Sequence, residues 1–172
     1  TERIILRQWR HGDFDSFSAM NADPQVMEFF PSTLSRAQSD MIALRLMQLI
    51  DERGWGFWAL EIPGVVEFAG FVGLHVPETV LPFSPCVEIG WRLARGHWGK
   101  GYATEAANAA MAFGFDELGL AEIVSFTAAI NRRSQKVMQR TGMTWSGEVF
   151  QHPNVDAASP LRPHVLYRKA RP

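Results

Sequence analysis

The chain has 172 residues, of which 47% are hydrophobic and 20% are charged, and its formal net charge is −1. This length favours a single globular domain with a substantial core, and the near-balance of charge gives no support for a nucleic-acid-binding or membrane-surface protein. No apolar run approaches the roughly 20 residues that a membrane-spanning helix needs, and the first residues lack the order of a secretory signal, so we expect a cytoplasmic protein with no membrane and no nucleic-acid partner.

The N-terminal third of the chain predicts one strand and two helices. Residues 1–9 are typical of an opening strand, and Asp13 is a candidate cap for a short helix that Asp23-Pro24 ends. Ser35–Gln38 has the pattern of a capping box at the start of a longer helix, which runs to Gly54. Because this second helix is apolar on more than one side, it is either buried between the sheet and a partner segment or forms a wall of a substrate cleft.

The middle of the chain predicts three strands. Residues 54–62 and 67–76, separated by a Pro-Gly turn, are typical of two paired strands, and a proline-rich loop then leads to a strand over residues 87–93. Cys86 is the only cysteine, which excludes an intrachain disulfide and a cysteine-built zinc site. We expect Cys86 to be a packing residue rather than a nucleophile, and we expect no metal.

A glycine-containing loop and a helix follow that strand. Small and apolar residues recur at helical spacing from Ala103 to Leu118, and Gly119 suits the left-handed position that often ends a helix. Gly99 and Gly101 would therefore precede a helix N-terminus, where free backbone N–H groups and the helix dipole favour an anion such as phosphate. The loop lacks the complete pattern of a P-loop or of a dinucleotide-binding fingerprint, so a phosphate site and a plain tight turn both remain open.

The last third of the chain predicts a strand over residues 122–127, a short helix capped by Asn131, and two strands over 144–150 and 164–168. The whole order is strand, two helices, three strands, helix, strand, helix and two strands. It predicts one α/β domain over residues 1–172, with a mixed sheet of about seven strands and about four helices.

Three segments together resemble the GNAT N-acetyltransferase family, and within it the branch that contains the ribosomal-protein N-acetyltransferases RimJ and RimL. They are the strand 87–93, the loop and helix start 98–106, and Asn131 with Ser134 and Gly142-Met143 beyond it. The resemblance covers nearly the whole chain, and it implies a mostly antiparallel sheet whose central parallel pair of strands splays apart. It also implies acetyl-CoA as the donor and a primary amine as the acceptor, without a metal.

The resemblance places the coenzyme on named residues. Its pyrophosphate would lie on the loop and the first helical turn, at Trp98, Gly99, Lys100, Gly101, Tyr102, Ala103 and Thr104. Its pantetheine arm would join the open edge of the splayed strands at Ile89, Gly90 and Trp91. Asn131 would contact the same arm, with a plain helix-cap role as the alternative. Arg133 or Lys136 would meet the ribose phosphate, with an ordinary solvated helix face as the alternative.

Two residues are candidates for catalysis. Glu88 lies on the strand beside the expected thioester and would act as a general base or hold the ammonium group, with a structural carboxylate as the alternative. Many family members carry a tyrosine seven residues after the Asn to protonate the departing thiolate, but this chain has Met138 there. Ser134, one turn earlier on the same helix side, is therefore the candidate to hydrogen-bond the sulfur, with helix-end polarity as the alternative. His75 and His164 are further candidate bases, for which a structural role is the alternative.

We therefore expect an enzyme that transfers the acetyl group of acetyl-CoA directly to a primary amine. An α-amine, with a pKa of about 7.7–8.0, demands less of a general base than a lysine amine near 10.4, so the N-terminal α-amine of a protein or peptide is the favoured acceptor. The alternatives are a small amine such as an antibiotic or metabolite, and a non-catalytic module that binds acyl-CoA. The exposed edges of the expected sheet are compatible with a homodimer.

Overall fold

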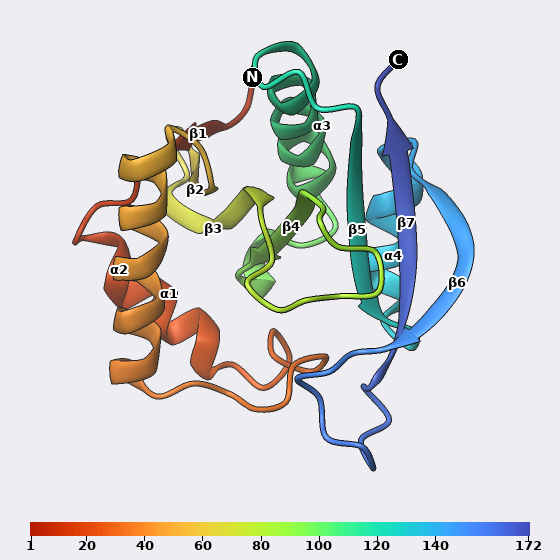
Figure 1. Ribbon diagram of the computed structural model, residues 1–172. Coiled ribbons are helices and arrows are strands. Elements are labelled where there is room, and N and C mark those ends of the chain that lie inside the picture. Colours follow the sequence, from red (N-terminus) through yellow and green to blue (C-terminus); the bar gives the residue numbers. More distant parts are fainter.

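The computed structural model describes residues 1–172 and contains a seven-stranded sheet with helices on both faces (Figure 1). The strand order is β1-β2-β3-β4-β5-β7-β6. The strands are β1 (Ile5–Arg7), β2 (Phe57–Ile62), β3 (Val66–His75), β4 (Glu88–Leu93), β5 (Glu122–Ala128), β6 (Thr144–Gln151) and β7 (Pro163–Ala170). The helices are α1 (Asp13–Ala22), α2 (Arg36–Arg53), α3 (Tyr102–Asp116) and α4 (Arg132–Arg140), with a short 3₁₀ turn at Arg95–His97. This arrangement confirms the predicted fold class and the predicted order of elements.

Local sequence signals set the ends of the long helix α2. Ser35 Oγ accepts a hydrogen bond from the Gln38 N–H at 3.3 Å, and the Gln38 side chain accepts one from the Ser35 N–H at 2.8 Å. Gly54, with φ of +78°, ends the helix in the left-handed conformation. The capping box and the glycine stop are therefore confirmed. None of the helices has the length and apolar composition that crossing a membrane requires.

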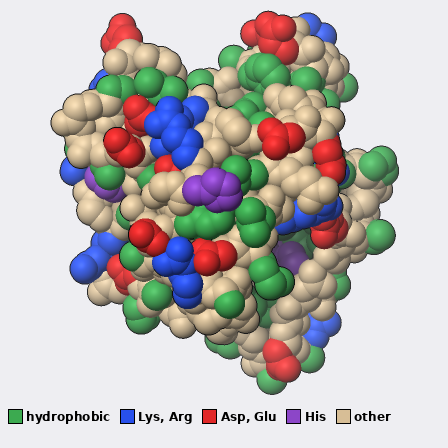
Figure 2. All heavy atoms as spheres, turned by 90° about the vertical axis from the view of Figure 1, so that its left-hand side faces the viewer, with side chains coloured by type: hydrophobic (Ala, Val, Ile, Leu, Met, Phe, Trp, Pro, Cys, Tyr) green, Lys and Arg blue, Asp and Glu red, His purple; other side chains and the backbone are tan.

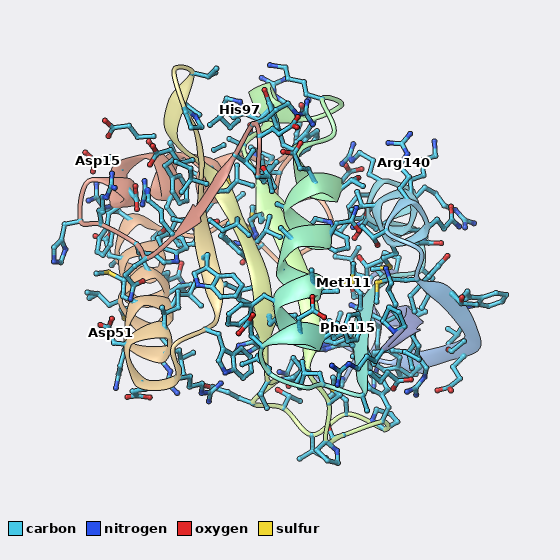
Figure 3. The ribbon with its side chains drawn as sticks, turned by 90° about the horizontal axis from the view of Figure 1, so that it is seen from above. Asp15, Asp51, His97, Met111, Phe115 and Arg140 are labelled. Carbon is cyan, nitrogen blue, oxygen red and sulfur yellow. The ribbon has the colours of Figure 1, made fainter.

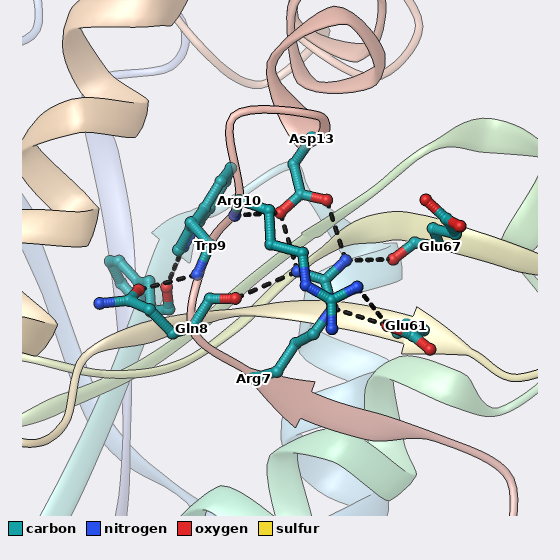
Figure 4. Close-up of polar contacts among 8 residues, drawn as sticks. Arg7, Gln8, Trp9, Arg10, Asp13, Glu61 and Glu67 are labelled. Atoms are coloured by element: carbon teal, nitrogen blue, oxygen red, sulfur yellow. Dashed lines mark hydrogen bonds and ion pairs between the residues drawn. The ribbon is translucent and has the colours of Figure 1, made fainter.

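A polar cluster at the start of the chain corrects two details of the prediction (Figure 4). The Asp13 carboxylate pairs with Arg7 at 2.8 Å, and Gly12 rather than Asp13 is the N-cap of α1. Arg7 also pairs with Glu61 on β2 at 2.7 Å, which fixes the edge strand and α1 to the sheet. β1 is shorter than the predicted strand because Trp9 turns inward, where its indole N–H donates to the Phe57 carbonyl at 2.7 Å.

Two apolar cores lie on opposite faces of the sheet. On the face covered by α1 and α2, the core includes Trp9, Phe17 and Phe71. On the other face, α3 packs through small alanines together with Met111 and Phe115, which Figure 3 labels on the helix. The close approach of α3 requires Gly114, where a Cβ would lie 2.9 Å from the side chains of both Ile123 and Leu74. α4 lies on the same face as α3, with Met138 in the shared core.

The parallel pair β4–β5 is where the sheet opens. β4 pairs with β3 along its whole length, whereas its register with β5 consists of Glu88 opposite Val124 alone. One residue further, the Ser125 hydroxyl rather than a backbone group donates to the Ile89 carbonyl, at 2.9 Å. The remaining edge of β4 therefore faces β5 without a strand partner, as the splayed parallel pair of the prediction requires.

Candidate functional site

The loop between β4 and α3 has the geometry of an anion cradle. Gly99 and Gly101 adopt positive φ values of +74° and +86°, as predicted. Gly101 is the N-cap of α3, and no side chain caps that helix end. The backbone N–H groups of the first turn, from Tyr102 to Thr104, are therefore available to a ligand at the positive end of the helix dipole. This cradle fits a pyrophosphate.

Contacts from other segments hold the loop in place. Arg3 donates to the Lys100 carbonyl at 3.2 Å, and its Nε lies 2.7 Å from the Glu105 carboxylate in the first turns of α3. The Lys100 ammonium donates to the Gly96 carbonyl at 2.9 Å. The Trp98 indole donates to the Leu93 carbonyl at 2.7 Å. Sequence reasoning missed Arg3, because no local pattern connects it with a loop nearly a hundred residues later.

The three strand residues predicted to meet the coenzyme lie at the opening of the sheet. Ile89 is buried against α3, and its carbonyl points toward β5, where it accepts from Ser125. Backbone direction alternates along a strand, so the N–H and C=O of Trp91 point to the same side, beyond the single β4–β5 pair. Gly90 lies on the other face, where the Phe57 ring packs against the strand and would have to shift for a Cβ, which would approach it to 2.9 Å.

Asn131 and Ser134 lie together at the start of α4, beside the end of β5. Asn131 Oδ1 accepts from the Ser134 N–H at 3.1 Å, and Asn131 Nδ2 donates to Thr127 Oγ1 at 2.9 Å. The helix-cap role of Asn131 is therefore present in the structure. The half-buried Ser134 makes no side-chain hydrogen bond within the protein, whereas Met138, one turn later, is 1% exposed in the core.

The two basic residues proposed for the ribose phosphate differ in their surroundings. Arg133 pairs with Glu28 at 2.5 Å, and its guanidinium lies over the Trp98 ring at 4.6 Å from the centroid. It thus joins α4 to the loop between β4 and α3 and to the segment that follows α1. Lys136 is exposed on α4.

Glu88 occupies the opposite side of β4 from the α3 core. Its side chain is half-buried and lines a cavity of about 340 Å³, together with His75, which lies directly across the β3–β4 ladder. Burial raises the pKa of Glu88 to about 8, and Glu88 forms no ion pair. Burial, followed by the charge of Arg53, lowers the pKa of His75, so its imidazole is neutral at pH 7.

The second candidate histidine lies elsewhere. His164, whose pKa burial lowers to about 4, packs against His152 at the start of β7, and their ring centroids are 4.7 Å apart. It does not line the Glu88 cavity. The structure instead brings together residues from four separate segments, one of which is α2, the helix that the sequence offered as a cleft wall. The individual lining residues, which sequence reasoning did not name, are Arg45, Leu46, Leu49, Pro77, Glu78, Thr79, Leu81, Phe126, His152 and Asn154.

β4 thus separates two halves of one site. Its edge toward β5 leads to the anion cradle and to Ser134, while its Glu88 face opens into the cavity. A ligand with an anionic end and an extended amide-containing arm fits the first half, because the cradle offers N–H groups and the open strand edge offers hydrogen-bonding backbone. A second substrate that gives up a proton fits the other half, the cavity beside Glu88.

Comparison with known proteins agrees with this geometry. The family model described as the acetyltransferase (GNAT) domain matches residues 3–144. The uncharacterized protein YkkB of Bacillus subtilis (strain 168) is 32% identical over 149 residues, which cover 85% of this chain and 84% of that protein. FsC-acetyl coenzyme A-N(2)-transacetylase of Aspergillus fumigatus is 32% identical over 151 residues, which cover 84% of this chain and 63% of that protein.

Solved structures share the fold. A GNAT-family acetyltransferase from Bacillus anthracis superposes with a TM-score of 0.81 at 22% identity, over 98% of this chain and 95% of that one. The ribosomal-protein-S5-alanine acetyltransferase of Vibrio fischeri has a TM-score of 0.77 at 18% identity, over 99% and 94%. The spermidine N-acetyltransferase of Vibrio cholerae, in complex with CoA and spermine, has a TM-score of 0.75 at 17% identity, over 99% and 97%. The chain therefore belongs to the GNAT acetyltransferase family and is an acetyl-CoA-dependent N-acetyltransferase.

Proposed function

We propose that the acceptor is an α-amine, most favourably the N-terminal α-amine of a protein or peptide, and that Glu88 is the general base. The observation that carries this proposal is the place of Glu88. It lines the cavity without an ion-pair partner, on the strand whose edge opens toward β5. An acceptor amine in the cavity would therefore lie between Glu88 and the donor side of the site.

The pKa of Glu88 suits an α-amine better than a lysine amine. Its value of about 8 is close to the roughly 7.7–8.0 of an α-amine, so proton transfer from the ammonium to the carboxylate costs little. From a lysine ammonium, with a pKa of about 10.4, the same transfer is uphill by roughly 2 pK units, or about 3 kcal/mol. The pKa of Glu88 thus matches that of the α-amine, which is the weaker base of the two amines.

On the donor side, acetyl-CoA supplies the acetyl group as a thioester. The N–H groups from Gly99 to Thr104 would hold its pyrophosphate, and the Trp91 backbone would pair with the pantetheine amides. The unpartnered Ser134 hydroxyl would donate a hydrogen bond to the sulfur as negative charge develops there. Asn131 keeps its cap and would in addition contact the pantetheine arm.

Arg133 would reach the ribose phosphate by exchanging its partner. Its present partner, Glu28, is an exposed carboxylate, and exposed pairs contribute little stability, so the exchange is inexpensive. Replacing Arg133 and Lys136 by alanine should reduce the preference for CoA over dephospho-CoA in a calorimetric titration. An unchanged preference would remove both residues from the proposal.

The comparisons name more than one kind of acceptor. One relative is named as an N(2)-transacetylase, one structural neighbour as a ribosomal-protein-S5-alanine acetyltransferase, and another as a spermidine N-acetyltransferase. Membership of the RimJ/RimL-like branch is part of this proposal, and the Vibrio fischeri structure supports it. A small amine is the second candidate acceptor, favoured by the modest volume of the cavity.

A pair of peptides tests the acceptor and the base together. One peptide has a free α-amine and no lysine, and the other has an acetylated N-terminus and one free lysine. We expect acetylation of the first peptide, detected by mass spectrometry, and a loss of about 10²–10⁴ in kcat for Glu88→Gln. Glu117→Gln, an exposed glutamate at the end of α3, is the control. Acetylation of the lysine peptide alone would refute the acceptor, and full activity of Glu88→Gln would refute the base.

A further inference from the structure

One part of the wall of the cavity at Glu88 is apolar. Leu46 and Leu49 come from α2, Leu81 comes from the loop before β4, and Phe126 comes from β5. Its volume of about 340 Å³ is near the lower limit of small-molecule sites. The cavity therefore has room for one compact side chain beside the amine.

The cavity offers one unpaired carboxyl group to a bound amine. Glu78, the other acidic residue of the lining, is already paired with Arg45 at 3.0 Å. Burial lowers the pKa of both His75 and His152, so these imidazoles are neutral at pH 7 and provide no charge. Glu88, which burial keeps largely protonated until about pH 8 in the free protein, is thus the acidic group that remains to take up a proton from a bound amine.

The rim of the cavity carries the Arg45–Glu78 ion pair on one side. Arg45 of α2 holds the loop before β4 through Glu78, and Asn154 holds the same loop through a 2.6 Å hydrogen bond to Thr79. A second ammonium group at this rim would meet the Arg45 guanidinium. On the face formed by α1 and α2, basic and acidic side chains are interspersed (Figure 2), so this face offers a polycation no extended acidic surface.

We propose that this cavity takes an acceptor with a single primary amine on a compact apolar group, and that it discriminates against polyamines and other polycationic amines. This proposal rests on the proposed function, because it takes Glu88 as the group that receives the amine. A second ammonium would lie against the leucine side chains without a free carboxylate to pair with. In a peptide acceptor, the side chain of the first residue packs against these leucines, and the rest of the peptide extends past the rim of the cavity.

The test compares acceptors that differ in this one respect. Four peptide acceptors are identical except for the first residue, which is Leu, Phe, Lys or Asp. Phenethylamine and spermidine are the two small-molecule acceptors. We expect kcat/KM for the Leu and Phe peptides to exceed that for the Lys and Asp peptides by about tenfold or more, and phenethylamine to exceed spermidine similarly. Spermidine or the Lys peptide as the best acceptor, or acetylation of none of the apolar amines, would overturn the proposal.

The same assay distinguishes this proposal from the proposed N-terminal acceptor. Equal acetylation of all four peptides would overturn the cavity preference while leaving an N-terminal acceptor in place. Acetylation of phenethylamine but of no peptide would overturn the peptide acceptor while supporting the cavity preference.

Two variants of α2 test the charge argument directly. Arg45→Gln releases Glu78, so it should raise kcat/KM for the Lys peptide several-fold relative to the Leu peptide. Arg36→Gln removes another exposed arginine of the same helix, which pairs with Asp15 and Asp40 and does not line the cavity, so the ratio should stay unchanged. An unchanged ratio in Arg45→Gln would overturn the assigned role of the Arg45–Glu78 pair.

Discussion

Glu88→Gln should make the protein more stable as it makes the enzyme less active. Burial raises the pKa of Glu88 from 4.5 to about 8. Below pH 4.5 the folded and unfolded chains both hold this proton, so Glu88 imposes no penalty. As the pH rises from 4.5 to about 8, the unfolded chain releases the proton and the folded chain keeps it, so the wild-type free energy of unfolding falls. Glutamine has no proton to release, and the variant lacks this loss.

The size of the effect follows from the two pKa values. At about 1.36 kcal/mol per pK unit, the interval from 4.5 to about 8 corresponds to at most about 5 kcal/mol, because Glu88 lines an open cavity that water can enter. The stability of Glu88→Gln relative to wild type should therefore increase from pH 5 to pH 8 and then level off.

Urea unfolding at each pH measures this difference, and the other titrating groups cancel because both proteins contain them. Glu78→Gln is the matched control, since Glu78 is exposed and its pairing with Arg45 lowers its pKa. That variant should show no gain in stability toward pH 8. Parallel stability profiles for wild type and Glu88→Gln would refute the buried-carboxyl reasoning.

Substitutions at three further positions test the donor side. Asn131→Ala should lower the free energy of unfolding by about 1 kcal/mol in urea, because it removes the α4 cap, whereas Asn131→Asp should retain most of it. Gly101→Ala places a side chain at φ of +86° in the anion cradle, so it should weaken acetyl-CoA binding in calorimetry; Gly12→Ala, in open space with φ of −61°, is the control. Ser134→Ala should lower kcat without moving the urea midpoint, and an unchanged kcat would exclude Ser134 from the reaction.

The parts of the fold that the sequence predicted are those set by neighbouring residues. The capping box of α2 and the positive φ of Gly101 depend on a few adjacent positions, so they are readable from the sequence. The prediction that Asp13 caps α1 was wrong because its carboxylate pairs with Arg7 instead, and only the folded chain brings Arg7 near. The sheet order, in which β7 lies between β5 and β6, likewise depends on long-range pairing.

The candidate site divides in the same way. Glu88, the glycine loop and Asn131 belong to contiguous motifs, and the resemblance located them. The long helix α2 was expected as a possible cleft wall, but the side chains that line the cavity could not be predicted, because Arg45, Glu78 and Asn154 come from three distant segments with no common pattern. The structure also adds the neutral state of His75, which results from its burial and from nearby arginines rather than from its sequence neighbours.

The single β4–β5 residue pair has a consequence for how the protein unfolds. In the free chain the two halves of the sheet share little backbone hydrogen bonding, so they can open separately, and amide exchange along β5 need not follow that along β4. A donor lying in the opening would bond to both halves and couple them. Acetyl-CoA would then act as a removable strand, and the cooperativity of unfolding, as well as its midpoint, would depend on the donor concentration.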